Sequence, residues 1–403
     1  MNKLIQLLPL ILLPALVHGQ DNEMDEQDFG VCIAGFQQQA RQESISERVI
    51  EDVVGNLQPI TRVVELDRSQ PEFVQTFAHY LNLRVSEARI EKGRELYREH
   101  REFLDELTNT YGVPGQYLVA FWGLETNFGS YLGTMPTLDS LATLACDPRR
   151  SRFFTTELMT ALKLLERESL TPEQMQGSWA GAMGHTQFMP SSYWRYAVDG
   201  DGDGQINLWA SEKDALASGA NFLSALGWKR EERWGREVSL PESFPYLQTG
   251  LGNPAPLSLW HESGVRRADG SLLPVVDMEG AVLVPAGHMG PAFLVYDNFS
   301  VIMKWNRSES YAISVGHLAD RIIGAGALEN PPSLNQVALT RAELVQLQES
   351  LIVKGYEPGE PDGVMGPATR SAISAFQRDE GLIADGFPNT ETLELLSLNF
   401  SKG

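Results

Sequence analysis

The amino-acid sequence predicts a mainly α-helical protein with a small β insertion and a small three-helix module at the C-terminus. From residue 27 to about residue 170, apolar residues recur at the three- and four-residue spacing of packed helices. Between about 229 and 298 the pattern changes to short apolar runs separated by Pro, Gly and Asn, which is typical of strands. A linker with two adjacent prolines, residues 324–339, then precedes the last module, residues 340–400. We therefore expect one large domain over 27–323 and a separate C-terminal module.

The composition restricts the kinds of partner that this chain can have. It has 403 residues, of which 42% are hydrophobic, and a formal net charge of −21. The length is sufficient for two or three domains with ample core. The negative charge argues against nucleic acid and anionic membrane surfaces as partners, because both repel such a protein. Recognition of a polyanionic polymer would have to rely on local hydrogen bonds and aromatic stacking.

The first 19 residues have the composition of a signal peptide. Lys3 supplies a short basic region, residues 4–17 are apolar, and Gly19 is a small residue at the expected cleavage point. This segment contains no cysteine that could carry a lipid. We therefore expect an exported, soluble, periplasmic protein without a membrane anchor, and we expect cleavage after Gly19.

The chain contains two cysteines, Cys32 and Cys146. In an oxidising compartment, two cysteines in one chain favour a disulfide over two free thiols. We expect this disulfide to tie the N-terminal helix to the large domain.

The helical and extended segments follow one another in a clear order. Helical patterns cover residues 29–40, 44–54, 72–81, 86–111, 113–129, 141–145, 152–167, 299–306 and 310–323. Runs that favour strands cover residues 237–240, 257–260, 275–277, 281–284 and 292–295.

One glutamate stands out in the helix predicted over residues 113–129. Leu118, Phe121 and Glu125 share one helical face, so the carboxyl group lies on an apolar stripe. Burial and the nearby helix C-terminus both raise the pKa of such a group. A glutamic acid that keeps its proton near neutral pH is a candidate general acid. The alternative is a partly exposed glutamate near a helix end.

A segment rich in glycine and alanine, residues 177–193, contains candidate ligand-binding groups. Ser178 and Gln187 offer neutral hydrogen-bonding groups of the kind that hold a sugar amide, and Phe188 offers a face for stacking. A junction between closely packed helices would explain the glycines equally well. We expect His185 to be structural or to lie at the rim, because one histidine alone does not form a metal site.

Trp305, Asn306 and Tyr311 form a second candidate sugar site between two predicted helices. Aromatic side chains on either side of an asparagine suit a sugar ring, although a corner between two helices would look similar.

The run from Asp199 to Asn207 matches the first nine positions of a calcium-binding loop. Asp199, Asp201 and Asp203 occupy positions 1, 3 and 5, and the backbone carbonyl of Gln205 occupies position 7. Position 12 of the loop is an alanine instead of the usual glutamate. Asp214, or alternatively Glu212, would therefore have to close the site. The alternative is an acidic, glycine-rich turn without metal.

The motifs together resemble the B-type family of lytic murein transglycosylases. The resemblance covers residues 27–323 and rests on four motifs in the same order, at 122–129, 178–193, 203–209 and 306–311. It implies a lysozyme-like helical fold with a small β insertion. Residues 362–369 similarly resemble the peptidoglycan-binding domain, with a weaker echo at Asp385-Gly386.

The resemblance assigns roles to single positions of this chain. It implies that Glu125 is the only catalytic acid. It also implies that the loop with Asp199, Asp201 and Asp203 can bind a structural calcium ion. The side chains that it implies for the glycan site are Ser178, Gln187, Phe188, Asn306, Tyr311 and Tyr80, together with Trp305 and Phe222. The last two stand where the family often has tyrosine, so stacking is kept but a hydroxyl is lost.

The activity that the resemblance implies is cleavage of the β-1,4 bond between N-acetylmuramic acid and N-acetylglucosamine in peptidoglycan. Glu125 would act first as acid and then as base, giving a 1,6-anhydromuramoyl product without a cofactor. No motif supplies the second carboxylate that most glycosidases use. Two alternatives remain, which are a hydrolytic muramidase of the same fold and a non-catalytic peptidoglycan-binding protein.

Overall fold

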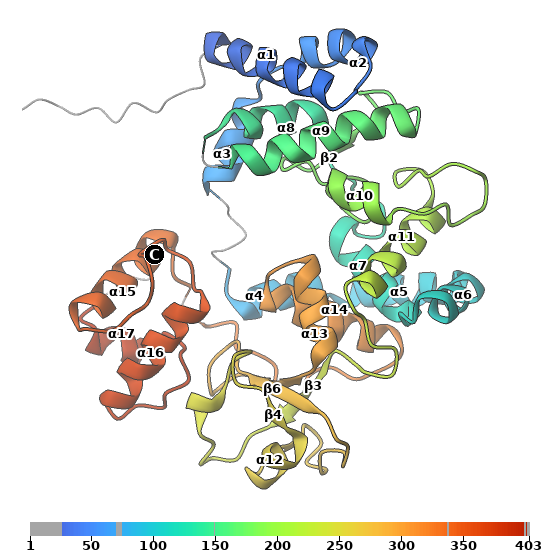
Figure 1. Ribbon diagram of the computed structural model, residues 1–403. Helices are drawn as coiled ribbons and strands as arrows, with labels where there is room; N and C mark the ends of the chain where they lie inside the picture. Colours follow the sequence, from blue (N-terminus) through green and yellow to red (C-terminus); the bar gives the residue numbers. More distant parts are fainter. Residues whose placement is uncertain (1–25, 70–74, 149, 337, 399, 401–403) are drawn as a thin grey trace, which may run out of the picture.

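The computed structural model describes residues 26–69, 75–148, 150–336, 338–398 and 400, so the expected signal peptide lies outside the described residues. The chain is mainly helical, with a small β insertion and a helical C-terminal module, as the sequence predicts (Figure 1). In the part of the chain that the structure describes, no helix combines the length and the apolarity needed to cross a membrane.

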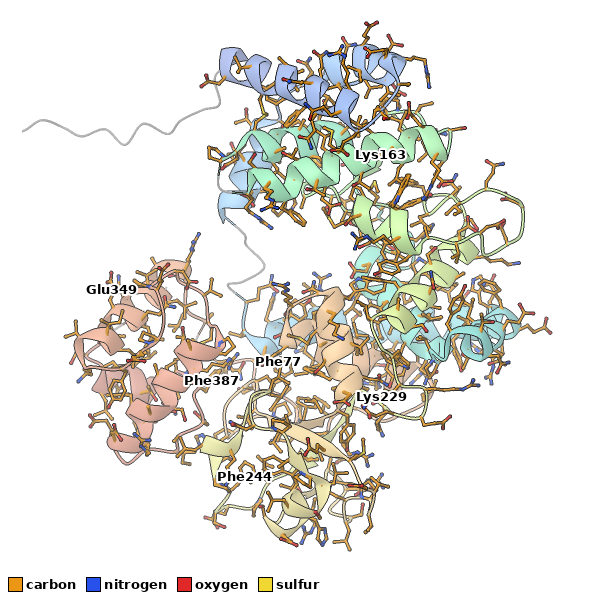
Figure 2. The ribbon with its side chains drawn as sticks, in the orientation of Figure 1. Phe77, Lys163, Lys229, Phe244, Glu349 and Phe387 are labelled. Atoms are coloured by element: carbon orange, nitrogen blue, oxygen red, sulfur yellow. A yellow bond between two sulfur atoms is a disulfide. The ribbon has the colours of Figure 1, made fainter. Side chains whose placement is uncertain are left out.

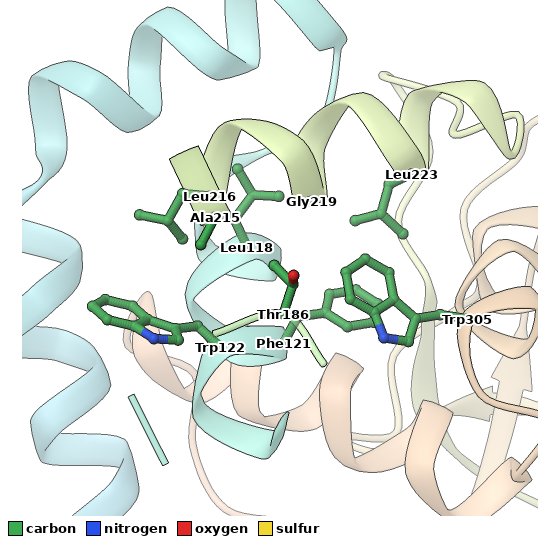
Figure 3. A pocket seen from close by; sticks show the side chains of 9 residues that line it. All are labelled: Leu118, Phe121, Trp122, Thr186, Ala215, Leu216, Gly219, Leu223 and Trp305. Carbon is green, nitrogen blue, oxygen red and sulfur yellow. The ribbon is translucent and has the colours of Figure 1, made fainter. Parts of the chain in front are cut away.

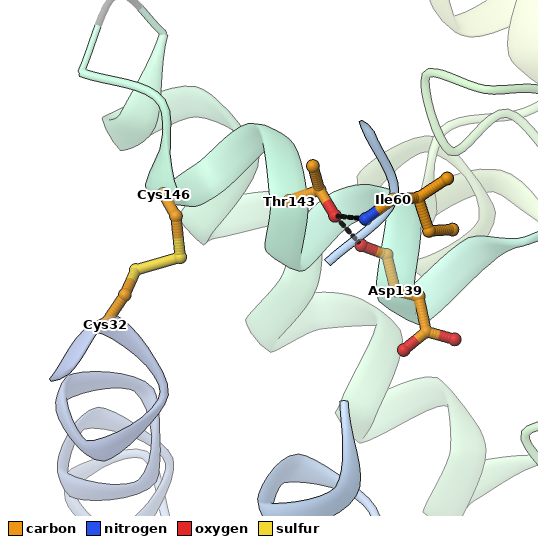
Figure 4. Close-up of a disulfide and its surroundings, with 5 residues drawn as sticks. All are labelled: Cys32, Ile60, Asp139, Thr143 and Cys146. Atoms are coloured by element: carbon orange, nitrogen blue, oxygen red, sulfur yellow. Dashed lines mark hydrogen bonds between the residues drawn. A yellow bond between two sulfur atoms is a disulfide. The ribbon is translucent and has the colours of Figure 1, made fainter. Parts of the chain in front are cut away.

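An N-terminal helical layer lies at the top of Figure 1. Its helices are α1 (Glu26–Gln42), α2 (Glu47–Asp52), α3 (Thr61–Ser69), α8 (Thr137–Cys146) and α9 (Ser151–Arg167), with a 3-10 turn at Val54–Asn56. Cys32 of α1 and Cys146 of α8 form the expected disulfide, with their Cα atoms 6.0 Å apart (Figure 4). Close by, Thr143 accepts the backbone N–H of Ile60 at 2.9 Å and donates to the carbonyl of Asp139 at 2.7 Å. The layer is thus held by one covalent bond and by hydrogen bonds between distant segments.

A second group of helices surrounds α7 (Gly115–Thr126). The group comprises α4 (Phe77–Arg84), α5 (Glu87–Glu99), α6 (Arg101–Tyr111), α10 (Pro190–Tyr196), α11 (Glu212–Ala225), α13 (Asp297–Trp305) and α14 (Glu309–Ile322). Nearly every residue of α7 is buried, so it is a core helix with no solvent-facing stripe. The prediction of a single helix over 86–111 was wrong, because the chain leaves helical geometry at His100. The His100 ring packs against Trp122 and lies 3.3 Å from the Glu212 carboxylate, so tertiary contacts hold this break.

The β insertion is one antiparallel sheet with strand order β4-β6-β7-β3-β5. The strands are β3 (Gly235–Ser239), β4 (Ala255–Pro256), β5 (Arg266–Arg267), β6 (Glu279–Leu283) and β7 (Ala292–Val295). A separate two-stranded sheet joins β1 (Met135–Pro136) to β2 (Gln176–Gly177).

Two of the runs that we expected to be strands are not strands. Residues 257–260 belong to helix α12 (Leu257–Glu262), and residues 275–277 are irregular. Leu257 and Trp260 are both buried at a spacing of three residues, which a helical turn allows, and the Trp260 indole donates to the Gly280 carbonyl at 2.8 Å. The apolar residues of this run therefore form the buried face of a helix.

The C-terminal module has its own hydrophobic core between α15 (Arg341–Val353), α16 (Pro367–Asp379) and α17 (Thr390–Leu395). The linker before it is tied to the β insertion. The Glu237 carboxylate accepts the backbone N–H groups of Glu329 and Asn330 at 2.9 and 2.8 Å, and the Asn330 side chain donates to the Gly290 carbonyl. These bonds hold the linker against the sheet, so it does not act as a free tether.

Candidate active site

Glu125 lies in the last turn of α7. The helix ends at Thr126, three residues earlier than the sequence suggested, because Asn127, Phe128 and Gly129 all have positive φ angles. A Cβ atom on Gly129 would lie 2.2 Å from the His185 ring, so only glycine fits there. This sharp ending places the glutamate at the point where the chain turns away from the core.

Two donors from distant segments meet on one oxygen of Glu125. The Tyr311 hydroxyl donates to Oε1 at 2.5 Å, and the Trp305 indole N–H donates to the same atom at 3.0 Å. Trp305 lacks the hydroxyl of the tyrosine that the family often has here, but its ring nitrogen donates to the carboxyl group instead. Both residues were expected to contact glycan, and the structure places them against Glu125.

Burial raises the pKa of Glu125 to about 7. The hydrogen bonds from Tyr311 and Trp305 and the charge of Arg84 act in the opposite direction. A pKa near 7 means that the carboxyl group can both lose and regain a proton at neutral pH.

Tyr80 and Arg84 of α4 lie at the same site. The Arg84 guanidinium carbon is 5.3 Å from the centre of the Tyr80 ring. Burial raises the pKa of Tyr80, the charge of Arg84 lowers it, and the charge of Glu125 raises it again. In the part of the chain that the structure describes, the Nε of Arg84 is buried without a hydrogen-bond partner. Sequence reasoning missed Arg84, although its position four residues after Tyr80 puts both on one helical face.

An aromatic cluster forms the wall behind Glu125. The Phe188 ring lies 5.2 Å from Phe222 and 5.3 Å from Trp305, and Trp305 lies 4.4 Å from Phe121. Phe188 is only 2% exposed, so the expectation that it offers a stacking face was wrong. Phe222 and Trp305 are partly exposed and remain able to contact a ligand.

A small cavity of about 10 Å³ lies behind Trp305 (Figure 3). It is apolar except for Thr186, whose hydroxyl is buried without a hydrogen-bond partner among the described residues. Such a volume is about that of a single water, so the cavity is a packing defect and no ligand site.

The glycine-rich segment positions two of the expected sugar-binding side chains. Ser178 accepts the backbone N–H of Ala182 through its hydroxyl at 3.0 Å. Gln187, with a φ of 49°, donates its amide to the carbonyls of Leu132 and Gly184 at 3.1 and 3.0 Å. These bonds fix the orientation of Gln187 and leave its carbonyl oxygen as the group that can accept from a ligand.

The remaining expected residue, Asn306, is exposed and follows the last residue of α13. It adjoins Trp305 in the chain.

His185 holds the end of α7 in place. Its Nδ1 accepts the Trp122 indole N–H at 2.9 Å, and its carbonyl accepts the Thr126 hydroxyl at 3.1 Å. Burial lowers the pKa of His185, so the ring stays neutral and keeps its acceptor. His185 is structural, as expected, and it supports the turn that carries Glu125.

The three expected aspartates do gather. Carboxylate oxygens of Asp199, Asp201 and Asp203 all lie within 4.8 Å of one another. Backbone N–H groups, chiefly that of Gly204, lower the pKa of Asp199 and keep it ionised. A cluster of three carboxyl groups on a glycine-rich turn is a donor set that fits a hard cation such as calcium.

The expected closing ligand of this loop points elsewhere. Asp214 is buried, and its two oxygens accept the backbone N–H groups of Gly200 and Asn207 at 2.8 and 2.7 Å. It thus ties both ends of the loop together and does not join the cluster of three acids. The alternative, Glu212, lies against His100. Position 7 of the loop, Gln205, donates its backbone N–H to Asp203 at 2.8 Å.

The comparison with known proteins now identifies the family. The family described as Transglycosylase SLT domain matches residues 28–320, and the family described as Putative peptidoglycan binding domain matches residues 340–396. This chain belongs to the SLT transglycosylase family. It is therefore an enzyme, and the non-catalytic alternative is excluded.

Individual relatives agree with this assignment. The chain is 31% identical over 305 residues to membrane-bound lytic murein transglycosylase B of Escherichia coli, covering 72% of this chain and 79% of that protein. It is 41% identical to SltB3 from Pseudomonas aeruginosa in complex with NAG-NAM-pentapeptide. That match has a TM-score of 0.88 and covers 92% of this chain and all of that one. The Escherichia coli lytic transglycosylase Slt35 in complex with calcium is 28% identical, with a TM-score of 0.65, over 72% of this chain and 92% of that one. The SLT transglycosylase thus has the mainly helical fold class that its sequence predicts.

Proposed function

We propose that this SLT transglycosylase cleaves the β-1,4 bond between N-acetylmuramic acid and N-acetylglucosamine in peptidoglycan, with Glu125 as its single acid and base. The observation that carries the proposal is the environment of Glu125, a carboxyl group with a pKa near 7 and two donors on one oxygen.

The two donors indicate which oxygen carries the proton. Tyr311 and Trp305 both donate hydrogen bonds to Oε1. A proton on Oε1 would therefore point at two groups that already direct a hydrogen toward this atom. The proton therefore resides on Oε2. In the first step Oε2 protonates the glycosidic oxygen while the bond from that oxygen to C1 of the muramyl residue breaks.

The second step uses the carboxylate that the first step leaves behind. Tyr311 and Trp305 continue to donate to this anion, and the nearby charge of Arg84 also favours it. The anion takes the proton of the muramyl C6 hydroxyl, and O6 bonds to C1 to give the 1,6-anhydro ring. No water is consumed, and Glu125 regains its proton for the next cycle.

A hydrolytic muramidase is the rival with the same fold. It requires a second carboxylate as nucleophile or as base for water. In the described part of the chain, the side chains that hydrogen-bond to Glu125 are Tyr311 and Trp305, neither of which is a carboxylate. In the proposal the N-acetyl group of the substrate stabilises the cationic sugar instead, with Ser178, Gln187 and Asn306 positioning it.

The test is the mass of the product released from purified sacculi. An anhydro product is lighter than the hydrolysed product by one water. Glu125→Gln keeps the shape of the side chain and its acceptor Oε1 but removes the acidic proton. The rate of product release should therefore fall on the order of 10²-fold or more, with the fold intact. A reducing-end product, or a variant that releases product at the wild-type rate, would refute the mechanism.

The acidic loop completes the proposal as a structural calcium site held by Asp199, Asp201 and Asp203. Calcium would neutralise their mutual repulsion and stabilise the loop without taking part in the chemistry. Millimolar calcium should therefore raise the melting temperature and leave turnover nearly unchanged. Asp201→Asn should abolish the rise, and a wild-type melting curve indifferent to calcium and chelator would leave only an acidic turn.

The proposed location is the periplasm, which follows from the signal-peptide composition of residues 1–19. The C-terminal module would then bind the same polymer that the catalytic domain cleaves.

A further inference from the structure

The C-terminal module contains the same hydrogen-bonded loop twice. In the first loop Gln348 receives the backbone N–H of Gly363 on its oxygen at 2.8 Å and donates its amide to Asp362 at 3.1 Å. In the second loop Gln377 receives the N–H of Gly386 at 2.8 Å and donates to Asp385 at 3.1 Å.

The equivalence extends to the residues after each aspartate. Oδ1 of Asp362 accepts the N–H of Val364 at 2.9 Å, and Oδ1 of Asp385 accepts the N–H of Phe387 at 2.8 Å. Each glutamine also reaches the next helix, through a threonine hydroxyl at 3.1 or 3.0 Å. Both loops thus use Oδ1 for the internal network and hold Oδ2 in the same relative position.

The second loop is occupied by another part of this chain. His288 of the β insertion donates its backbone N–H to Oδ2 of Asp385 at 2.8 Å, and its ring Nδ1 lies 2.6 Å from the same oxygen. A Cβ atom on Gly287 would lie 2.9 Å from Asp385 and from Phe387, so the two segments are in close contact. Phe387 and Phe77, which are both labelled in Figure 2, line one cavity of about 110 Å³. Oδ2 of Asp385 therefore receives the backbone N–H and the ring of a single residue, His288.

The first loop presents the same acceptor to solvent. Asp362 and Val364 are exposed, and Oδ2 of Asp362 has no partner in the described part of the chain. We propose that the loop around Asp362 is a second docking site of the module, and that it binds a peptide strand with a backbone N–H beside a basic or donor side chain. This proposal rests on the proposed function, in which such a strand is the stem peptide of peptidoglycan.

The chemistry of the loop favours peptide over glycan. Its acceptor is one carboxylate oxygen in a protein with a net charge of −21, which attracts an amine and a peptide N–H together. The side chain beside it is the aliphatic Val364, whereas glycan sites commonly use an aromatic ring for stacking.

The decisive experiment measures binding of full-length Glu125→Gln, which cannot digest its ligand, to two preparations. One is purified sacculi, and the other is the same sacculi after an amidase has removed the stem peptides. The second substitution, Asp362→Asn, is introduced into this Glu125→Gln protein. It retains the oxygen that accepts from Val364 and Gln348 but replaces Oδ2 with an amide group that donates. We expect this change to weaken binding to intact sacculi about tenfold, with an unchanged melting temperature and no effect on stripped sacculi.

Asp385→Asn is the matched control. It should loosen the contact with His288, seen as faster proteolysis of the linker, while binding of intact sacculi remains. Val364→Lys provides a second test of the exposed loop, because its ammonium group would occupy the acceptor, and it should also weaken binding.

Three results would overturn the proposal. They are unchanged binding by both exposed-loop variants, equal weakening on intact and stripped sacculi, and Asp362-dependent self-association without stem-peptide binding. The proposed function fails separately, if the wild-type chain releases no anhydro product whether or not binding depends on Asp362.

Discussion

At the residue scale, the properties of Glu125 follow from a balance of opposing influences. Burial raises its pKa, whereas Tyr311, Trp305 and Arg84 hold the pKa near 7. General-acid catalysis needs the protonated form, so kcat/KM should fall tenfold per pH unit above about pH 7. In the proposed mechanism the second step needs the anion, and the groups that stabilise this anion also limit how far the pKa of Glu125 can rise.

Arg84→Met tests this balance. Removing the cation should raise the pKa of Glu125, so the upper limb of the pH–kcat/KM profile moves to higher pH. The carboxylate needed for ring closure also loses about 1 kcal/mol of stabilisation, which corresponds to a roughly fivefold lower kcat.

Two further variants separate this role of Arg84 from general damage. Arg84→Lys should restore much of the profile, and Arg101→Met, at an exposed pair with Asp105, should leave it unchanged. An Arg84→Met enzyme with the wild-type pH profile would show that the guanidinium does not act on Glu125.

At the element scale, helix α11 supports the active site from behind and contains a glycine in its middle. A Cβ atom on Gly219 would lie 3.7 Å from the Trp305 ring and 3.8 Å from Thr186, which is ordinary contact distance. These two residues also line the small cavity in Figure 3. The glycine thus costs helix stability without being required by close packing.

Gly219→Ala should therefore stabilise the fold by about 0.5–1 kcal/mol, measured by chemical denaturation. The matched control is Gly316→Ala on α14, where the new Cβ would lie 2.1 Å from the Trp234 ring. That change should destabilise by about 1–3 kcal/mol. Destabilisation by Gly219→Ala would mean that the space behind Trp305 is needed.

At the scale of the whole molecule, segments far apart in sequence are fastened at a few points. The disulfide joins residues separated by 114 positions, and the linker and His288 fasten the C-terminal module to the β insertion. Closing a long loop by a covalent bond removes entropy from the unfolded chain.

Replacing Cys32 and Cys146 together by serine should therefore lower the free energy of unfolding by roughly 2–4 kcal/mol. The denaturant midpoint of the double variant gives this value, and the wild type treated with reductant should match it. Thiol counting on the denatured, non-reduced wild type should find no free thiol, whereas two titratable thiols would contradict the disulfide.

The sequence by itself determined the features that depend on local chemistry. Helical spacing and caps indicated most of the helices, although α3, α10, α11 and α12 were not among those expected. The glutamate on an apolar stripe identified Glu125 as the candidate acid. Three aspartates at alternate positions of a glycine-rich turn identified the acidic loop. These features depend on residues a few positions apart, whose geometry the backbone dictates.

Only the tertiary structure decided which distant groups meet. Trp305 and Tyr311 lie 180 and 186 positions after Glu125, and no local pattern says that both donate to one of its oxygens. Packing likewise buried Phe188 and turned Asp214 toward two backbone N–H groups. A side chain's hydrogen-bond partner is set by the segments packed around it, because a buried polar group must be satisfied by whichever group the fold brings within reach.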